Sequence, residues 1–213
     1  MNLRPKKHQL FGLLPAALVQ THGPRHGVAR FLSFDDGPHP EHTPRLLDLL
    51  ALHGVHASFF VVGERAERHP ALIRRIVAEG HLLGNHSWSH NRFAQLPLAG
   101  QLAEIDRTDA LLASFDDRVR HRIRPPQGHL SLALLVHFAR RRRCIAYWCH
   151  DSLDYQPMPV AELTARLQRH PPAAGDIVLM HDDSARAGAA LGALLPRWLG
   201  DGYAFHAMSP ERA

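Results

Sequence analysis

The sequence contains few cysteines. Only Cys144 and Cys149 occur among its 213 residues. They lie five positions apart in an apolar stretch that is typical of a strand, and this spacing places them on opposite faces, too far apart to form a bridge. A disulfide framework is therefore not implied. The cysteines favour neither an oxidising nor a reducing compartment for the protein.

Long apolar runs are also missing. The apolar stretch at residues 10–19 follows Lys6 and Lys7 and so resembles a signal peptide in outline. Gly12 and Pro15 interrupt it, no small-residue cleavage site follows, and a stretch of this length is too short to span a bilayer. We therefore expect a cytoplasmic enzyme without stable membrane insertion.

Lysine is scarce, because Lys6 and Lys7 are the only lysines in a basic set of 25 residues. Arginine therefore carries most of the positive charge, and its one dense run is at residues 140–143. Four arginines at the end of a helix suit the negative end of its dipole. A nucleic-acid-binding face would need basic residues interleaved with aromatic ones over an extended surface. We expect a solvated helix end and no nucleic-acid partner.

The chain shows no sequence repeat and no low-complexity linker, and 45% of its residues are hydrophobic, enough for one sizeable core. Short β-rich runs alternate with longer amphipathic runs. The predicted strands cover residues 28–34, 56–62, 81–84, 121–124, 144–148, 176–180 and 203–206. The predicted helices cover residues 43–52, 70–79, 97–115, 130–142, 160–169 and 185–199. Strands separated by helices predict a parallel α/β sheet, either a barrel or an open doubly wound sheet.

Polar residues stand where the predicted strands end. They are Asp35 and Asp36 after the first strand, His86 and His90 after the third, Arg124 at the end of the fourth, Asp151 and Asp154 after the fifth, and His181 after the sixth. In parallel α/β folds the ligand site lies at the carboxyl ends of the strands. These residues, which are scattered through the sequence, are therefore predicted to converge on one rim.

Histidine is abundant, with 18 residues, and it is the side chain that most often ligates transition metals. The spacing of His86 and His90 predicts two imidazoles on one face of a helical turn, where a divalent metal can bind both. Chance alone gives roughly one or two pairs with this spacing in such a sequence. The position of this pair after a strand is what favours metal ligation over two surface histidines.

Asp35 and Asp36 are adjacent carboxylates directly after an apolar strand. They repel each other unless positive charge lies nearby, and a bound metal relieves that cost. The alternative is that one aspartate caps the following turn while the other is solvated. One aspartate with two histidines makes a three-ligand site with an open position, which is the form of catalytic zinc sites.

Five segments together resemble, in order and spacing, the motifs of the polysaccharide deacetylases, which are carbohydrate esterase family four with the NodB homology domain. The segments are Ser-Phe-Asp-Asp-Gly-Pro at 33–38, His-Ser-Trp-Ser-His at 86–90, Arg-Pro-Pro-Gln-Gly at 124–128, Asp-Ser-Leu-Asp-Tyr at 151–155 and Leu-Met-His at 179–181. The resemblance spans residues 28–206. The length of the chain and residues 80–86 are especially similar to the small chitooligosaccharide deacetylases.

The resemblance implies a single-domain distorted (β/α) barrel with about seven parallel strands. Residues 1–27 would be an N-terminal extension and residues 28–213 the catalytic domain. Asp36, His86 and His90 would hold one divalent ion, with Zn²⁺ favoured and Co²⁺ or another divalent ion as alternatives.

The same resemblance implies roles for the remaining motif residues. Asp35 would be the general base and His181 the general acid that protonates the departing amine. The residues that would support them are Arg124, which orients Asp35, Asp154, which orients His181, and Gln127, whose backbone N–H would complete an oxyanion hole.

Two further residues are candidates for contact with substrate, and two positions depart from the family pattern. Tyr155 stands where the family usually has tryptophan, and Gln127 stands where it usually has tyrosine. These changes are expected to affect sugar preference but not the chemistry. Trp88 lies between the two proposed histidine ligands and either stacks on a sugar ring or serves packing.

The implied activity is removal of acetyl groups from an N-acetylglucosamine-containing glycan, while the oligomeric state stays open. One alternative is a carbohydrate-binding barrel without catalysis, which would have no reason to keep a base, an acid and a metal set together. Another is an amidohydrolase that acts on a non-sugar amide, such as a relative that has lost its metal. None of the expected metal ligands is missing here.

Overall fold

The computed structural model describes residues 10–25 and 27–211, so Lys6 and Lys7 lie outside the described residues. Its strands are β1 (Val19–Gln20), β2 (Ala29–Asp35), β3 (Ser58–Val61), β4 (Leu82–Asn85), β5 (Ile145–Ala146), β6 (His150–Asp151), β7 (Ile177–His181) and β8 (Ala204–Phe205). Its helices are α2 (His42–Leu52), α3 (Gly63–Arg68), α4 (Pro70–Ala78), α5 (Leu98–Asp116), α6 (Leu132–Arg140), α7 (Val160–Arg169) and α8 (Ala185–Gly200), with short 3-10 turns η1 (Phe93–Gln95) and η2 (Pro126–Gly128).

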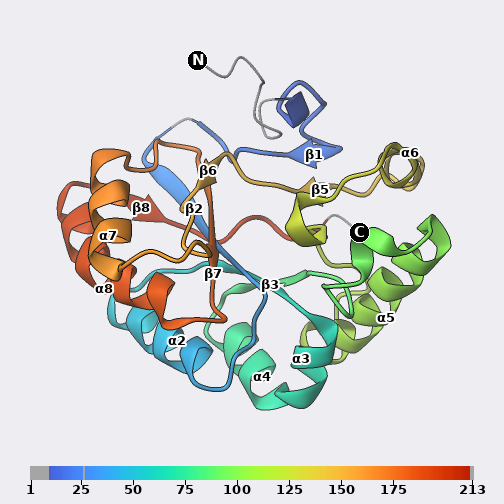
Figure 1. Cartoon of the computed structure of the whole chain (residues 1–213), viewed down its shortest axis with the longest axis horizontal. Coiled ribbons are helices and arrows are strands. Elements are labelled where there is room, and N and C mark those ends of the chain that lie inside the picture. The colour runs from blue at the N-terminus through green and yellow to red at the C-terminus, as the bar shows by residue number, and fades with distance from the viewer. Residues whose placement is uncertain (1–9, 26, 212–213) are drawn as a thin grey trace.

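The strands pair in parallel and form a curved wall surrounded by helices (Figure 1). The main sheet has the order β4-β3-β2-β7-β6, β8 pairs with the beginning of β2, and β1 pairs with β5. Single parallel bridges from Ile123 to Asn85 and to Ile145 continue the wall from β4 to β5. An antiparallel bridge between His22 and Asp176 connects the segment after β1 to the beginning of β7. The predicted single-domain α/β fold is thereby confirmed, with a barrel that is closed by isolated bridges.

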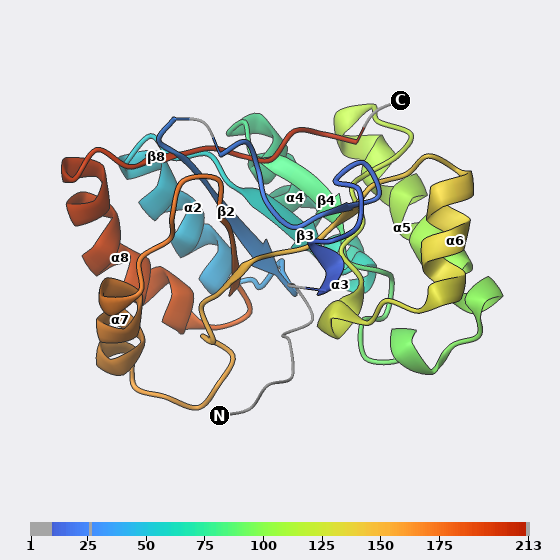
Figure 2. The same ribbon diagram turned by 90° about the horizontal axis from the view of Figure 1, so that it is seen from above.

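The core forms because the central strands are buried on both faces, as parallel strands between helices usually are. In β2, Leu32 and Phe34 face one apolar cluster and Phe31 faces another. The helices that cover this wall bury one face each; in α4, Ile73 and Ile76 lie three positions apart and are fully buried. Figure 2 shows from above how the strands cross the molecule between α8 on one side and α5 on the other.

Several predicted elements differ from the structure in extent. The predicted strand 121–124 is reduced to the bridges of Ile123, and the predicted strand 144–148 contains only β5. Helix α3 was not predicted, because its sequence Gly-Glu-Arg-Ala-Glu-Arg has no apolar periodicity. The two-residue strands β1 and β6 are too short to give a sequence pattern of their own.

The N-terminal segment packs on the barrel. Strand β1 pairs with β5, and Phe11 contacts the ring of Tyr147 edge-on, with ring centroids 5.0 Å apart. The boundary between residues 27 and 28 stays a prediction. Among the described residues, no helix combines the length and apolar character that crossing a membrane requires.

The arginine run at residues 140–143 is only partly solvated, which corrects the sequence prediction. Helix α6 ends at Arg140, and Arg140, Arg141 and Arg142 are exposed. Arg143 is instead buried, and its Nη2 donates to Asp109 Oδ2 at 2.9 Å. This ion pair ties the segment after α6 to α5.

Candidate active site

The polar residues predicted to converge on one rim lie at or near the carboxyl ends of the strands. Asp35 is the last residue of β2 and His181 the last of β7, and the two are register partners across the neighbouring strands. Asp36 follows β2 and His86 follows β4. The parallel sheet therefore brings together side chains that are far apart in the sequence.

Asp35 is held from inside the barrel by Arg124. The guanidinium is fully buried, and its Nη1 donates to Asp35 Oδ1 at 2.7 Å and to Ser33 Oγ at 2.9 Å. Its Nη2 donates to the carbonyl of Tyr147 at 3.2 Å, and its carbon lies 4.0 Å from the ring centroid of Phe60. A guanidinium that is fixed at several points holds the carboxylate in one orientation. The predicted contact between these two residues is present.

Asp36 faces two imidazoles rather than the guanidinium. Its backbone has φ of 75°, in the left-handed region, so the chain turns directly after Asp35. Arg65 Nη1 donates to the Asp36 carbonyl at 2.5 Å, and the amide of Val62 donates to the Gly37 carbonyl at 2.9 Å. These bonds fix the turn, so the two adjacent carboxylates have different partners.

His86 and His90 converge on one oxygen of Asp36. The Oδ1 atom lies 3.3 Å from His86 Nε2 and 3.0 Å from His90 Nε2. Burial alone would raise the pKa of Asp36, but the two imidazoles hold it well below its usual range. The pKa of His90 is raised, because the Asp36 carboxylate outweighs the effect of its burial.

The donor set of these three residues fits a divalent metal. Their potential ligand atoms all lie within 4.8 Å of one another. Asp36 Oδ1 is buried, yet it accepts no well-aligned hydrogen bond from either ring. His86 Nδ1 lies 2.7 Å from the Arg124 carbonyl, so it donates there and leaves Nε2 toward Asp36. One carboxylate oxygen and two imidazole nitrogens that converge in this way are typical of a catalytic zinc site.

The loop that carries the two histidines is not a helical turn, which corrects the reason for their predicted proximity. Ser87 and His90 have φ of 66° and 51°, and residues 86–90 contain no helix. Asn85 Oδ1 accepts from the amide of Ser87 at 2.9 Å, and Ser87 Oγ accepts from the amide of His90 at 3.1 Å. Asn85 and Ser87 therefore shape the site. The only sequence signal for them was their position at the end of a predicted strand.

His181 and Asp154 form a second polar pair on the same rim. Asp154 Oδ1 lies 2.8 Å from His181 Nδ1, and Oδ2 accepts from the His181 amide at 2.8 Å. Ser152 Oγ also donates to Asp154 Oδ1, at 2.9 Å. Burial alone would lower the pKa of His181, but the Asp154 hydrogen bond and charge, with Asp35 and Asp36, raise it to about 9. The contact between Asp154 and His181 is present, and the role of Asp154 in catalysis stays a prediction.

The loop at Gln127 is tightly constrained by its neighbour. Gln127 is exposed, with φ of 55°, and Gly128 has φ of 62°. A Cβ atom on Gly128 would lie 2.5 Å from Tyr147 Oη and 2.8 Å from the ring of Trp148. Glycine is therefore required at position 128, whereas the Gln127 residue is exposed.

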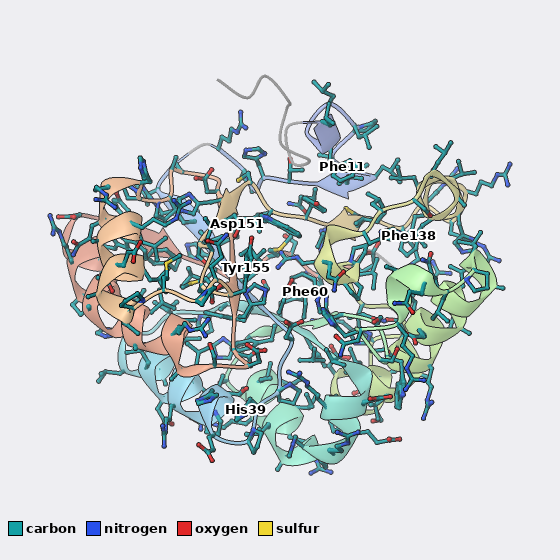
Figure 3. The ribbon with its side chains drawn as sticks, in the orientation of Figure 1. Phe11, His39, Phe60, Phe138, Asp151 and Tyr155 are labelled. Carbon is teal, nitrogen blue, oxygen red and sulfur yellow. The ribbon has the colours of Figure 1, made fainter. Side chains whose placement is uncertain are left out.

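Tyr155 and Trp88 have different surroundings. Tyr155, which is labelled in Figure 3, is 52% exposed. Its ring contacts the His181 ring edge-on, with centroids 5.5 Å apart. Trp88 is only 7% exposed and lies under the Arg107 guanidinium, whose carbon is 3.4 Å from the ring centroid. This burial fits the packing alternative for Trp88 and not sugar stacking. Trp148, which the sequence did not single out, is half-buried and stacks on Tyr147.

Asp182 is a further polar residue of the rim that sequence reasoning missed. It is buried, burial raises its pKa to about 7, and Thr43 Oγ1 donates to its Oδ2 at 2.5 Å. A Cβ on Gly37 would lie 2.2 Å from its carboxylate oxygens, so Asp182 packs against the turn that positions Asp36. Beside it, a pocket of about 350 Å³ opens between α2 and α8 and includes His181 in its wall. The only sequence signal for Asp182 was its place directly after His181.

Comparison with known proteins gives one consistent result. The family model "Polysaccharide deacetylase" matches residues 23–139. A peptidoglycan-N-acetylglucosamine deacetylase of Bacillus cereus is 33% identical over 75% of this chain, which spans 58% of that relative's length. A second one from the same organism is 31% identical over 92% of this chain and 94% of its own. A chitooligosaccharide deacetylase of Sinorhizobium fredii is 38% identical over 75% of each chain.

Solved structures agree with these relatives. The Bc1960 peptidoglycan N-acetylglucosamine deacetylase superposes with a TM-score of 0.83 over 90% of this chain and 91% of that one, at 29% identity. The peptidoglycan deacetylase PdaC from Bacillus subtilis superposes with a TM-score of 0.77 over 85% and 87%, at 28% identity.

The raised pKa of His181 is predicted to depend on Asp154. In the metal-free protein, Asp154→Asn removes the charge that outweighs burial, so the pKa of His181 should fall from about 9 to below the ordinary histidine value. A titration of the His181 ring protons by NMR measures this shift. Asp151→Asn is the matched control, since Asp151 Oδ1 accepts from the Leu153 amide and its removal should shift His181 much less. Equal shifts in the two variants would contradict the assignment.

Proposed function

Because the chain belongs to the polysaccharide deacetylase family, carbohydrate esterase family four, we propose that it is a metal-dependent de-N-acetylase that hydrolyses the acetamido group of N-acetylglucosamine units in an oligo- or polysaccharide. The observation that carries the proposal is the meeting of a metal-ligand set with a separate base and acid on one rim. The set is Asp36, His86 and His90, while Asp35 and His181 stand on neighbouring strands.

Asp36, His86 and His90 would hold the metal, with Zn²⁺ favoured by the mixed carboxylate and imidazole donors. When bound, the ion would supply Lewis acidity toward the acetyl carbonyl and the attacking water. The Bc1960 relative was crystallised with 4-naphthalen-1-yl-N-oxidanyl-benzamide, an N-hydroxyamide, and groups of that class chelate metals. A metal-chelating ligand on this relative supports metal dependence in the family, and we extend it to Asp36, His86 and His90 of this chain.

Asp35 is the proposed general base. Arg124 occupies its Oδ1, and Oδ2 lies 3.7 Å from His86 Nε2, so Oδ2 faces the proposed metal site. A water molecule held between Asp35 Oδ2 and the proposed metal site would attack the acetyl carbon through its oxygen. Asp35 Oδ2 would accept the proton that this water loses. Because the guanidinium is fully buried and fixed, Asp35 needs no rearrangement to accept that proton.

His181 is the proposed general acid. An amide nitrogen leaves as an amine only when it is protonated, so the reaction needs a donor on the side opposite the base. The Asp154 carboxylate keeps His181 protonated at neutral pH and fixes its ring through Nδ1, so Nε2–H is the group that would be donated. The backbone N–H of Gln127 is proposed to stabilise the carbonyl oxygen as negative charge develops on it.

The proposed glycan has room beside the acid. The pocket between α2 and α8 includes His181, and half-exposed Tyr155 lies against the same ring. An aromatic face beside a pocket suits the apolar face of a sugar. Peptidoglycan and chitooligosaccharides, which the named relatives act on, are the substrate classes to test first.

The alternatives receive less support from the same geometry. A carbohydrate-binding barrel would gain nothing from a fully buried arginine and adjacent carboxylates, because buried charges are costly without a function. A non-sugar amidohydrolase shares the proposed chemistry, so only a substrate comparison separates it from a glycan deacetylase.

The direct test is acetate release from N-acetylated chitooligosaccharides and peptidoglycan by the zinc-reconstituted protein. Treatment with a chelator should abolish release, and added Zn²⁺ or Co²⁺ should restore it. A simple acetanilide serves as the non-sugar control and should be cleaved far more slowly. Full activity in the metal-free protein, or equal activity on the anilide, would contradict the proposal.

The two adjacent aspartates should respond differently to mutation. Asp36→Ala should lose metal and activity together, because two imidazoles alone bind zinc poorly. Asp35→Asn should keep the metal and lose about two to four orders of magnitude in turnover, the usual effect of removing an acid–base group. Elemental analysis beside turnover tests both. Metal lost from Asp35→Asn and retained in Asp36→Ala would reverse the assignment.

The oxyanion loop should tolerate a change of side chain but not of backbone. Gln127→Ala should leave turnover within about threefold, since only its backbone N–H is proposed to act. Gly128→Val should reduce turnover much more, because its Cβ would collide with Tyr147 and Trp148 and displace the loop. Comparable large losses in the two variants would show that the Gln127 side chain itself contributes.

A further inference from the structure

A second group of metal-ligating side chains lies outside the rim. In the part of the chain that the structure describes, His22, Cys149 and Asp176 place one potential ligand atom each within 4.8 Å of the others. Asp176 directly precedes β7, whereas His181 ends it. At about 3.3 Å per residue, the two groups are separated by roughly the length of that strand. The second group therefore lies at the amino ends of β6 and β7, away from the proposed active site.

The backbone of all three residues is fixed around this point. His22 and Asp176 form the antiparallel bridge that connects the segment after β1 to β7. The amide of Gly23 donates to the Gly175 carbonyl at 2.8 Å, and the amide of Cys149 donates to the Ile177 carbonyl at 3.2 Å. The three side chains are thus presented by backbone that is already hydrogen-bonded, so little chain ordering is needed to bring them together.

Two of the side chains, Cys149 and Asp176, are oriented toward each other, and the His22 ring has a ligand atom within 4.8 Å of both. Cys149 Sγ lies 3.3 Å from Asp176 Oδ1, close to the separation of two ligands on a tetrahedral zinc ion with bonds of about 2.0 to 2.3 Å. Asp176 Oδ2 points elsewhere: it accepts from the Ala173 amide at 2.8 Å and lies 3.7 Å from His150 Nδ1. His22 Nδ1 lies 2.9 Å from Thr21 Oγ1, which steadies its ring. Asp176 Oδ1 is therefore the oxygen that faces the group.

The chemistry of the set differs from that of the rim. It includes a thiol, and soft sulfur with imidazole nitrogen and one carboxylate favours Zn²⁺ or Co²⁺ over Mg²⁺ or Ca²⁺. A thiolate and a carboxylate would balance the two charges of such an ion. All three residues are partly accessible, so an ion can enter from solvent and keep a water as a fourth ligand.

We propose that His22, Cys149 and Asp176 form a second divalent transition-metal site, which joins the segment after β1 to the β6–β7 side of the barrel. In the described structure the His22–Asp176 bridge is isolated, like the bridges of Ile123 between β4 and β5. The strands β2, β3, β4 and β7 instead pair with their neighbours over several residues. A metal that binds only the folded chain stabilises it, so this site closes the barrel at that junction. Its role is structural, and it is independent of the deacetylase chemistry.

Cobalt distinguishes the two sites, because a thiolate bound to Co²⁺ gives a charge-transfer absorption band in the near ultraviolet and the rim contains no cysteine. The metal-free protein is titrated with Co²⁺ and its spectrum recorded. The wild type should show the band. Cys149→Ser should lose it, and the matched control Cys144→Ser should keep it, since Cys144 Sγ lies near Arg122 instead. No band in the wild type, or an undiminished band in Cys149→Ser, would overturn the proposal.

A second variant leaves the thiol in place and guards against a misfolded Cys149→Ser protein. His22→Ala should weaken the Co²⁺ affinity measured from the band by about tenfold or more, a typical cost of disturbing a metal site. An unchanged affinity would count against His22 as a ligand and against the proposal. Acetate release by zinc-reconstituted Cys149→Ser should equal that of the wild type, so failure of this second site is separate from failure of the proposed function.

Discussion

Two neighbouring carboxylates at the end of β2 set the constraint on which the rest of the site depends. Asp35 and Asp36 would repel each other if both faced the same surroundings. The left-handed backbone of Asp36 separates them, so that Asp35 meets the buried Arg124 guanidinium and Asp36 meets His86 and His90. Each carboxylate thereby gains its own partners, and the proposed base and the proposed metal ligand become distinct groups.

The parallel sheet also places the proposed acid, His181, beside the proposed base, Asp35. Asp35 and His181 are register partners on β2 and β7, so the proposed base and the proposed acid stand side by side at one edge. Their environments push them toward opposite roles: Asp35 has an arginine partner, while Asp154 raises the pKa of His181 to about 9. A carboxylate held by arginine beside a histidine whose pKa is raised suits a site that performs base and acid chemistry together.

The sequence predicted the parts of this molecule that strand and helix periodicity or local motif spacing determine. The central strands, six helices and the convergence of motif residues at the carboxyl ends follow from such patterns. Contacts made through irregular backbone could not be predicted in the same way. The loop at residues 86–90 brings its histidines together through Asn85 and Ser87, not through a helical turn. Arg143 and Trp88 are buried by tertiary partners, Asp109 and Arg107, whose positions no local pattern reveals.

We infer that the rim holds a metal ion and that the proposed base, Asp35, stands outside its ligand shell. Anomalous scattering at the zinc absorption edge, measured from crystals of the zinc-reconstituted protein, tests this inference. We expect a strong peak bonded to Asp36, His86 and His90, with Arg124 still paired to an Asp35 that does not ligate the ion. An absence of zinc from these three residues, or a zinc ion bonded to Asp35 in place of Asp36, would contradict it.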